Sequence, residues 1–186
     1  MKTQFISIAA AVVVLLAAAQ PAQAALIDNQ AALAGSTQVI DFEAFDGLLT
    51  SGPEVLSTDV TFTGDQFSEL GANNRDLQDN GAWGGFGNHF AATGFIGELR
   101  FTFSGLSAGA GAFANHFALD ALPGFALVVS AYGDNNQIIE THTVTIDTDF
   151  TSYDQGQFVG IMRNSADIRS ISFKGGRPSR RSSPIN

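Results

Sequence analysis

Carboxylates are the most abundant ionisable side chains in this chain. The sequence holds 18 Asp and Glu residues, three His residues and no Cys. The absence of Cys excludes cysteine nucleophiles, thiolate zinc sites and redox pairs. Hard oxygen donors are the ligands that calcium prefers in proteins, so calcium is the metal that this composition favours.

Motifs that would assign a metal site or a reaction are weak. Residues 76–81 superficially resemble a calcium loop, but Gly87 occupies the twelfth position, where an EF-hand requires a bidentate Glu. A zinc site without Cys would need all three histidines to converge, namely His89, His116 and His142. A glycosidase needs only two positioned carboxylates, which the 18 acidic residues neither support nor exclude.

Trp83 is the residue that the sequence singles out for ligand binding. It is the only Trp of the chain and lies in a Gly-rich stretch, Gly81-Ala82-Trp83-Gly84-Gly85. An aromatic ring on a loop can stack on the apolar face of a sugar ring, which predicts a carbohydrate contact. The alternative is that Trp83 plugs one end of the fold, because the neighbouring sequence is rich in Phe.

The stretch from Phe125 to Ile146 is the element on which the rest of the fold depends. Two apolar, β-branched runs flank the turn-forming cluster Gly133 to Gln137, which predicts a β-hairpin. In the first run both alternating sets are apolar or small, as in a central strand that is covered on both faces. The second run carries Glu140 and His142 on one face, which indicates an edge or rim position.

Further alternating segments predict strands at 38–45, 98–104, 109–118, 158–162 and 168–173, and a strand or strand pair at 55–63. Residues 64–97 are the least regular part of the sequence, and a loop of this length in a compact domain is either functional or mobile, unless it contains short strands. About eight short strands, frequent Gly and no long helix predict an all-β fold, an antiparallel jelly-roll-like β-sandwich.

The first 24 residues have the pattern of a signal peptide. A basic start precedes an apolar run from Phe5 to Ala19, and Ala22-Gln23-Ala24 is a small-x-small cleavage pattern. The apolar run is too short for a comfortable transmembrane helix, so we expect export without a stable membrane span. After cleavage behind Ala24 we expect a lead-in segment at 25–35, the β-sandwich domain at 36–175 and a disordered basic tail at 176–186.

Charge is unevenly distributed along the chain. Residues 25–173 contain all 18 Asp and Glu residues but only four Arg residues. An acidic body disfavours nucleic acids and anionic membrane surfaces as partners. It is compatible with solubility outside the cell, or with multivalent cations as counter-charges.

The leader, the hairpin at 125–146 and several strand patterns resemble exported bacterial proteins of the PEP-CTERM type. The strand patterns are Val39 to Phe45, Val60 to Gly64, Gly109 to Phe113, Phe158 to Ile161 and Ile168 to Phe173. The resemblance implies a jelly-roll-like sandwich over residues 36–174. Members usually continue into a strand with adjacent aspartates, a Val-Pro-Glu-Pro motif, a transmembrane helix and a basic end, none of which follows here. We therefore hypothesise a truncated or frame-shifted tail, which resequencing of the downstream DNA tests, and do not carry over cell-surface sorting.

Jelly-roll carbohydrate-binding domains, which the expected fold resembles, often hold a structural calcium between a carboxylate near the first strand and one near the last. The resemblance implies that Glu43 and Asp46 supply the first half of such a site. The aspartates of the second half would belong to the missing strand. The alternative is that both carboxylates lie on a solvated face of the first strand.

These observations together predict an exported, non-enzymatic β-sandwich protein of a bacterium, extracellular or at the cell surface. We expect it to be associated with the extracellular matrix and to bind an extracellular polysaccharide or calcium. The alternatives are a secreted glycoside-active enzyme on the same fold, and a purely structural protein without a ligand.

Overall fold

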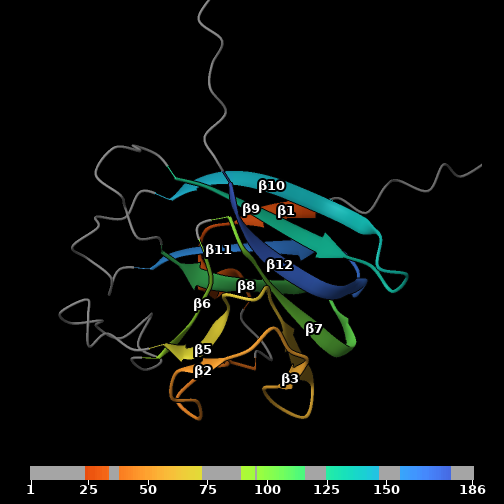
Figure 1. The fold of residues 1–186 in the computed structure, drawn as a ribbon. Coiled ribbons are helices and arrows are strands. Elements are labelled where there is room, and N and C mark those ends of the chain that lie inside the picture. The colour runs from red at the N-terminus through yellow and green to blue at the C-terminus, as the bar shows by residue number, and fades with distance from the viewer. Residues whose placement is uncertain are drawn as a thin grey trace, which may run out of the picture.

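A computed structural model describes residues 24–33, 38–72, 89–94, 96–115, 125–146 and 156–176 of the chain. Within these ranges the regular structure consists of β-strands and one short 3-10 turn, η1 (Gln30–Leu33) (Figure 1). The strands are β1 (Ala24–Ile27), β2 (Leu48–Leu49), β3 (Glu54–Val55), β4 (Val60–Thr63), β5 (Glu69–Ala72), β6 (Phe90–Ala92), β7 (Glu98–Ser107), β8 (Gly109–Ala114), β9 (Phe125–Tyr132), β10 (Ile138–Ile146), β11 (Gln157–Arg163) and β12 (Ile168–Gly176).

The described strands form three antiparallel sheets. The main sheet has six strands in the order β10-β9-β12-β7-β4-β3, and a three-stranded sheet has the order β1-β11-β8. A second three-stranded sheet, β2-β5-β6, lies at the lower end of the molecule in Figure 1. The prediction of an antiparallel all-β sandwich is therefore confirmed.

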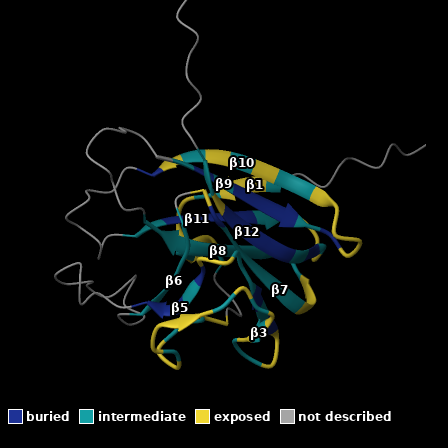
Figure 2. Cartoon of the chain, in the orientation of Figure 1, coloured by how far each residue is buried: buried dark blue, intermediate teal, exposed yellow. Residues whose placement is uncertain are grey.

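The core lies between the main sheet and the sheet β1-β11-β8. Its buried side chains come from β9, β10, β11 and β12: Leu127, Val129, Ala131, Ile146, Val159, Ile161, Ile168, Ile171 and Phe173. In Figure 2, β9, β11 and β12 are mostly dark blue, whereas β10 is not. Each large apolar side chain that is fully buried contributes about 1.5–3 kcal/mol. Packing between these two sheets is therefore the main source of stability in a chain without Cys.

The predicted hairpin is present as β9 and β10. The turn closes with hydrogen bonds from the Gly133 nitrogen to the Gln137 oxygen (2.9 Å) and from the Asn136 nitrogen to the Gly133 oxygen (3.0 Å). β9 lies between β10 and β12, whereas β10 is the edge strand of the main sheet. On the face of β9 away from the core, buried Ser130 shares a 2.9 Å hydrogen bond with Thr141 of β10.

The prediction of a first strand at 38–45 is wrong. Phe42 has a positive φ of 61°, which breaks an extended chain, and the Phe45 nitrogen donates to the Phe42 oxygen (3.0 Å) to close a turn. The Phe42 ring lies 6.2 Å from the Phe101 ring of β7, centroid to centroid. The segment is therefore a loop that covers apolar side chains of the main sheet. Its alternation of apolar and polar residues occurs although it pairs with no strand in the described part of the chain.

Other boundaries differ in detail from the predicted ones. Residues 54–63 form the antiparallel pair β3 and β4, which agrees with the predicted strand pair at 55–63, and the irregular region 64–97 contains the short strands β5 and β6. β8 ends at Ala114 rather than at residue 118. Short strands such as these have too few residues for alternation to reveal them.

β1 lies in the stretch around the expected cleavage point and pairs with β11, from Ala24 opposite Arg163 to Ile27 opposite Gly160. Asn29 then caps η1, because its Oδ1 accepts from the Ala31 nitrogen (2.9 Å). The lead-in segment is thus part of the sandwich. Residues 1–23 and 177–186 lie outside the described ranges, and no helix in the described part is long and apolar enough to cross a bilayer.

Candidate ligand-binding hollow

A surface hollow of about 590 Å³ lies where the connection from β4 to β5 meets the connection from β6 to β7. The residues that line it combine polar, aromatic and small side chains: Asp65, Gln66, Phe67, Gly94, Ile96 and Gly97. Both connections belong to the region that the sequence indicates to be the least regular. Each begins at the end of a strand, so the sheets hold the two halves of the hollow.

Asp65 is held in one position by a turn. Its Oδ1 accepts from the Phe67 nitrogen (2.8 Å) and from the Thr93 hydroxyl (2.9 Å), and its own nitrogen donates to the hydroxyl of buried Ser68 (2.9 Å). An Asp that bonds the backbone two residues onward forms a rigid local turn. Because Thr93 follows β6, this carboxylate also joins the two connections.

The second carboxylate oxygen of Asp65 remains available for a ligand. No described residue donates a hydrogen bond to Oδ2. Oδ2 is also not a fully buried atom, so a ligand can reach it. Oδ2 lies close to Gly97, where an added Cβ would be 2.3 Å from it and 2.2 Å from the Thr93 hydroxyl. Only a glycine permits this approach, so the packing at Gly97 leaves room for the carboxylate.

The apolar part of the hollow is exposed to solvent. The side chain of Phe67 is 66% exposed and that of Ile96 is 59% exposed. An aromatic ring beside a carboxylate and an amide suits a sugar, whose C–H face stacks on the ring while its hydroxyl groups donate to the carboxylate. Among the described residues that line the hollow, Asp65 is the only carboxylate.

The predicted calcium ligands are both described and both exposed. Glu43 is occupied by His89: its Oε1 accepts from the His89 nitrogen (2.8 Å), and its Oε2 lies 3.5 Å from Nδ1 of the same residue. Among the residues that the structure describes, no group of three His, Asp or Glu side chains is placed to hold a metal ion. Calcium at Glu43 and Asp46 stays a prediction.

Trp83, the residue predicted to stack on a sugar, lies outside the described ranges, as does His116. The sequence reasoning did not identify Asp65 or Phe67. The only sequence feature that could have indicated this site is an aromatic residue, Phe67, two positions after Asp65 and shortly after the strand that ends at Thr63. The approach of this segment to Gly94, Ile96 and Gly97 is visible only in three dimensions.

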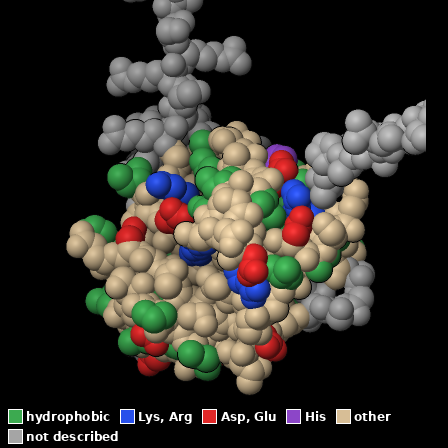
Figure 3. Space-filling view, turned by 90° about the vertical axis from the view of Figure 1, so that its right-hand side faces the viewer, with side chains coloured by type: hydrophobic (Ala, Val, Ile, Leu, Met, Phe, Trp, Pro, Cys, Tyr) green, Lys and Arg blue, Asp and Glu red, His purple; other side chains and the backbone are tan. Residues whose placement is uncertain are grey.

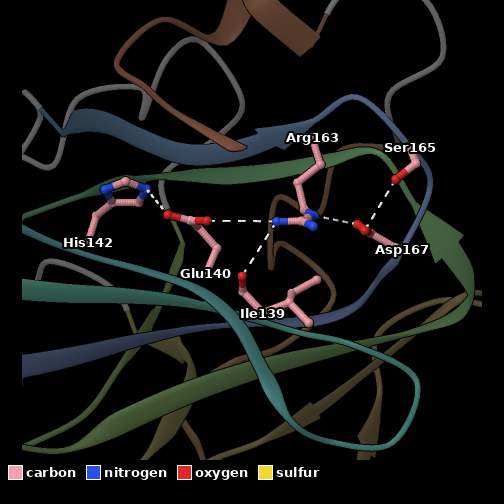
Figure 4. A network of polar contacts seen from close by, with 6 residues as sticks. All are labelled: Ile139, Glu140, His142, Arg163, Ser165 and Asp167. Carbon is pink, nitrogen blue, oxygen red and sulfur yellow. Dashed lines mark hydrogen bonds and ion pairs between the residues drawn. The ribbon is translucent and has the colours of Figure 1, made fainter. Parts of the chain in front are cut away.

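The edge strand β10 carries a second polar cluster, shown in Figure 4. Glu140 and His142 lie opposite Ala131 and Val129 and so face inward, with 3.0 Å between Glu140 Oε1 and His142 Nε2. Glu140 Oε2 is also 3.7 Å from Nη1 of Arg163 at the end of β11. Inward-facing charges on an edge strand discourage pairing with another chain. We interpret this cluster as structural, and it explains the polar interruption in β10.

Residues 105–109, Gly-Leu-Ser-Ala-Gly, match the Gly-x-Ser-x-Gly spacing of hydrolase nucleophile elbows. An elbow requires a strand followed by a helix, whereas here the segment joins β7 to β8. The Ser107 hydroxyl donates to the Gly109 oxygen (2.7 Å) and accepts from the Gly109 nitrogen (3.2 Å). Ser107 therefore closes a turn between two strands, and the match carries no catalytic meaning.

Comparisons with protein-family models, with curated proteins and with solved structures give no match to this chain.

Proposed function

We propose that this protein is an exported, non-enzymatic β-sandwich that binds an extracellular glycan at the hollow formed by Asp65, Phe67 and Ile96. The observation that carries the proposal is the exposed Phe67 beside a carboxylate that the turn holds rigid, to whose Oδ2 no residue in the described part of the chain donates. The leader supports export, and the acidic composition suits a protein that acts outside the cell.

Rigidity is the physical reason why this hollow is suited to a weak ligand such as a sugar. Binding costs less when the groups that contact the ligand are already ordered. Asp65 is fixed by hydrogen bonds from Phe67, Ser68 and Thr93, so little conformational freedom is lost there. Phe67 has only two side-chain torsions to fix on binding.

A glycan array identifies the ligand, and calorimetry then measures its affinity. We expect Phe67→Ala to weaken binding about tenfold or more, because loss of the stacked ring removes at least about 1.4 kcal/mol. Leu49→Ala is the matched control, because Leu49 is 73% exposed on β2 and does not line the hollow. This control should bind as the unchanged protein does.

Three results would contradict the proposal. Equal weakening by the Phe67 and Leu49 substitutions would show that the hollow is not the site. Release of new reducing ends from the bound glycan would favour the alternative, a glycoside-active enzyme on the same fold. A protein that binds no glycan on the array would instead be a structural protein without a ligand.

A further inference from the structure

The outer face of the main sheet carries mostly polar residues on its central strands. Along β7, β9 and β12 the polar residues that alternate with the core side chains are Glu98, Arg100, Thr102, Ser130, Tyr132, Ser170, Ser172 and Lys174, and Val128 lies beside Lys174 on the same face. The register places Ser170 between Thr102 of β7 and Tyr132 of β9. Side chains that are neighbours across strands on one face contact one another. This face therefore groups a guanidinium, a phenol and several hydroxyls.

Arg100 is held at several points on this face. Its Cζ lies 3.9 Å from the centroid of the Tyr132 ring, a cation–π contact. Its Nε and Nη2 both donate to the hydroxyl of buried Ser170, at 2.9 Å and 2.6 Å, and Nη2 also donates to Asn136 Oδ1. A planar guanidinium fixed in this way is already ordered before any ligand arrives.

Arg100 differs from the other basic side chains that the structure describes, because none of its partners carries a charge. Arg163 lies 2.6 Å from Asp167, Arg169 lies 2.5 Å from Asp134, and Lys174 lies 3.9 Å from Glu98. Figure 3 shows such pairs, with blue and red side chains lying against each other on one face. Arg100 thus keeps an uncompensated positive charge in an acidic protein.

Part of this charge is open to solvent. No described residue accepts a hydrogen bond from Nη1 of Arg100. Nη1 is also not a fully buried atom. Glu98, the acidic residue two positions earlier on the same face, is engaged by the Tyr132 hydroxyl (3.3 Å) and by Lys174 (3.9 Å). Nη1 therefore keeps N–H groups that can donate a hydrogen bond to an anion.

We infer that Arg100, stacked on Tyr132, is a subsite for the carboxylate of an acidic glycan, such as a uronic acid chain. Charge-assisted hydrogen bonds from a guanidinium to a carboxylate are among the strong ones, and Nη1 is the nitrogen that can make one here. Arg100 pairs in register with Thr63, the last residue of β4, and the connection that carries Asp65 begins after this residue. The inference rests on the proposed glycan site and gives its ligand a charge.

The test compares trigalacturonate with the neutral galactose trisaccharide, by calorimetry on the whole protein at low salt. We expect the acidic sugar to bind at least about tenfold more tightly, and Arg100→Gln to abolish this preference. Lys174→Gln removes the same charge from the same face and is the matched control. It should leave the preference within about twofold, because Lys174 is already paired with Glu98.

Three outcomes would overturn the inference: no preference for the acidic sugar, equal loss in both variants, or displacement of trigalacturonate by an equal concentration of sulfate. The Arg100 Nε–H resonance of the unchanged protein gives a second readout that does not depend on folding of a variant. It should shift with trigalacturonate and not with the neutral sugar, and no shift would also contradict the inference.

The proposed hollow is tested separately with Phe67→Ala. If Phe67→Ala weakens the binding of both trisaccharides to the same extent, the hollow is supported as the glycan site. The preference for the acidic sugar then comes from Arg100. If Phe67→Ala changes neither sugar while Arg100→Gln still removes the preference, the hollow is wrong and the Arg100 subsite stands.

Discussion

Arg163 illustrates how single residues of this protein accommodate charge between apolar sheets. Its side chain is only 9% exposed, and its Nε donates to Asp167 at 2.6 Å. Asp167 in turn accepts from the Ser165 hydroxyl at 3.2 Å, and Arg163 also reaches the Ile139 oxygen at 3.5 Å. Removal of one partner from a buried charge is costly, because the remaining charge keeps its desolvation penalty. The cluster is therefore sensitive to loss of any one carboxylate.

At the residue scale we predict that Asp167→Ala lowers the free energy of unfolding by about 1–3 kcal/mol, as expected when a buried charge loses its main partner. Urea denaturation followed by circular dichroism measures this change. Asp134→Ala is the control, because Asp134 is 65% exposed in its pair with Arg169, and exposed pairs contribute less than about 1 kcal/mol. Equal costs for the two substitutions would show that burial of Arg163 does not matter.

At the scale of elements, the fold depends on close contact between β5 and the loop that precedes β2. Gly71 has a φ of +71°, at a register shift in the pairing of β5 with β6. An added Cβ there would lie 2.3 Å from the backbone carbonyl of Phe45, and the Gly71 oxygen accepts from the Gly47 nitrogen (3.0 Å). Such a bulge needs glycine both for its conformation and for the close approach. Gly71 thus allows the loop 38–47 to pack against the third sheet.

We predict that Gly71→Ala destabilises the protein by about 2–4 kcal/mol, since it combines a strained φ with a backbone clash. Gly105→Ala is the matched substitution, because nothing lies within 4 Å of a Cβ added on this exposed residue of β7. It should be neutral or stabilising by up to about 1 kcal/mol. Thermal unfolding measures both, and a Gly71 variant as stable as the Gly105 variant would refute the steric argument.

At the scale of the whole molecule, the smaller sheet opposite the main sheet is completed by the start of the described chain. β1 pairs with β11 from Ala24 to Ile27, and Leu33 of η1 approaches Gly109 of β8, where an added Cβ would lie 2.7 Å from it. Without β1, the edge of β11 would be open, and unpaired edges favour aggregation. The segment 25–33 thus belongs to the sandwich.

We predict that a chain starting at residue 36 melts about 5–15 °C lower than a chain starting at residue 25, and that it aggregates more readily. The loss of strand hydrogen bonds and of partly buried Ile27 and Leu33 accounts for the difference. Calorimetry and light scattering measure the two effects. Equal melting temperatures would mean that β1 adds nothing to the sandwich.

By itself, the sequence determined the all-β antiparallel class, the β9–β10 hairpin and four of the other strands, namely β7, β8, β11 and β12. These features follow from alternation and turn residues, which act over a few neighbouring positions. Only the tertiary structure decided that residues 38–45 form a loop, that Glu43 meets His89 46 positions away, and that Arg100 meets Ser170 70 positions away. It also decided that Phe67 and Ile96 share one hollow. Contacts of this kind depend on the order and register of the sheets, which local periodicity does not encode.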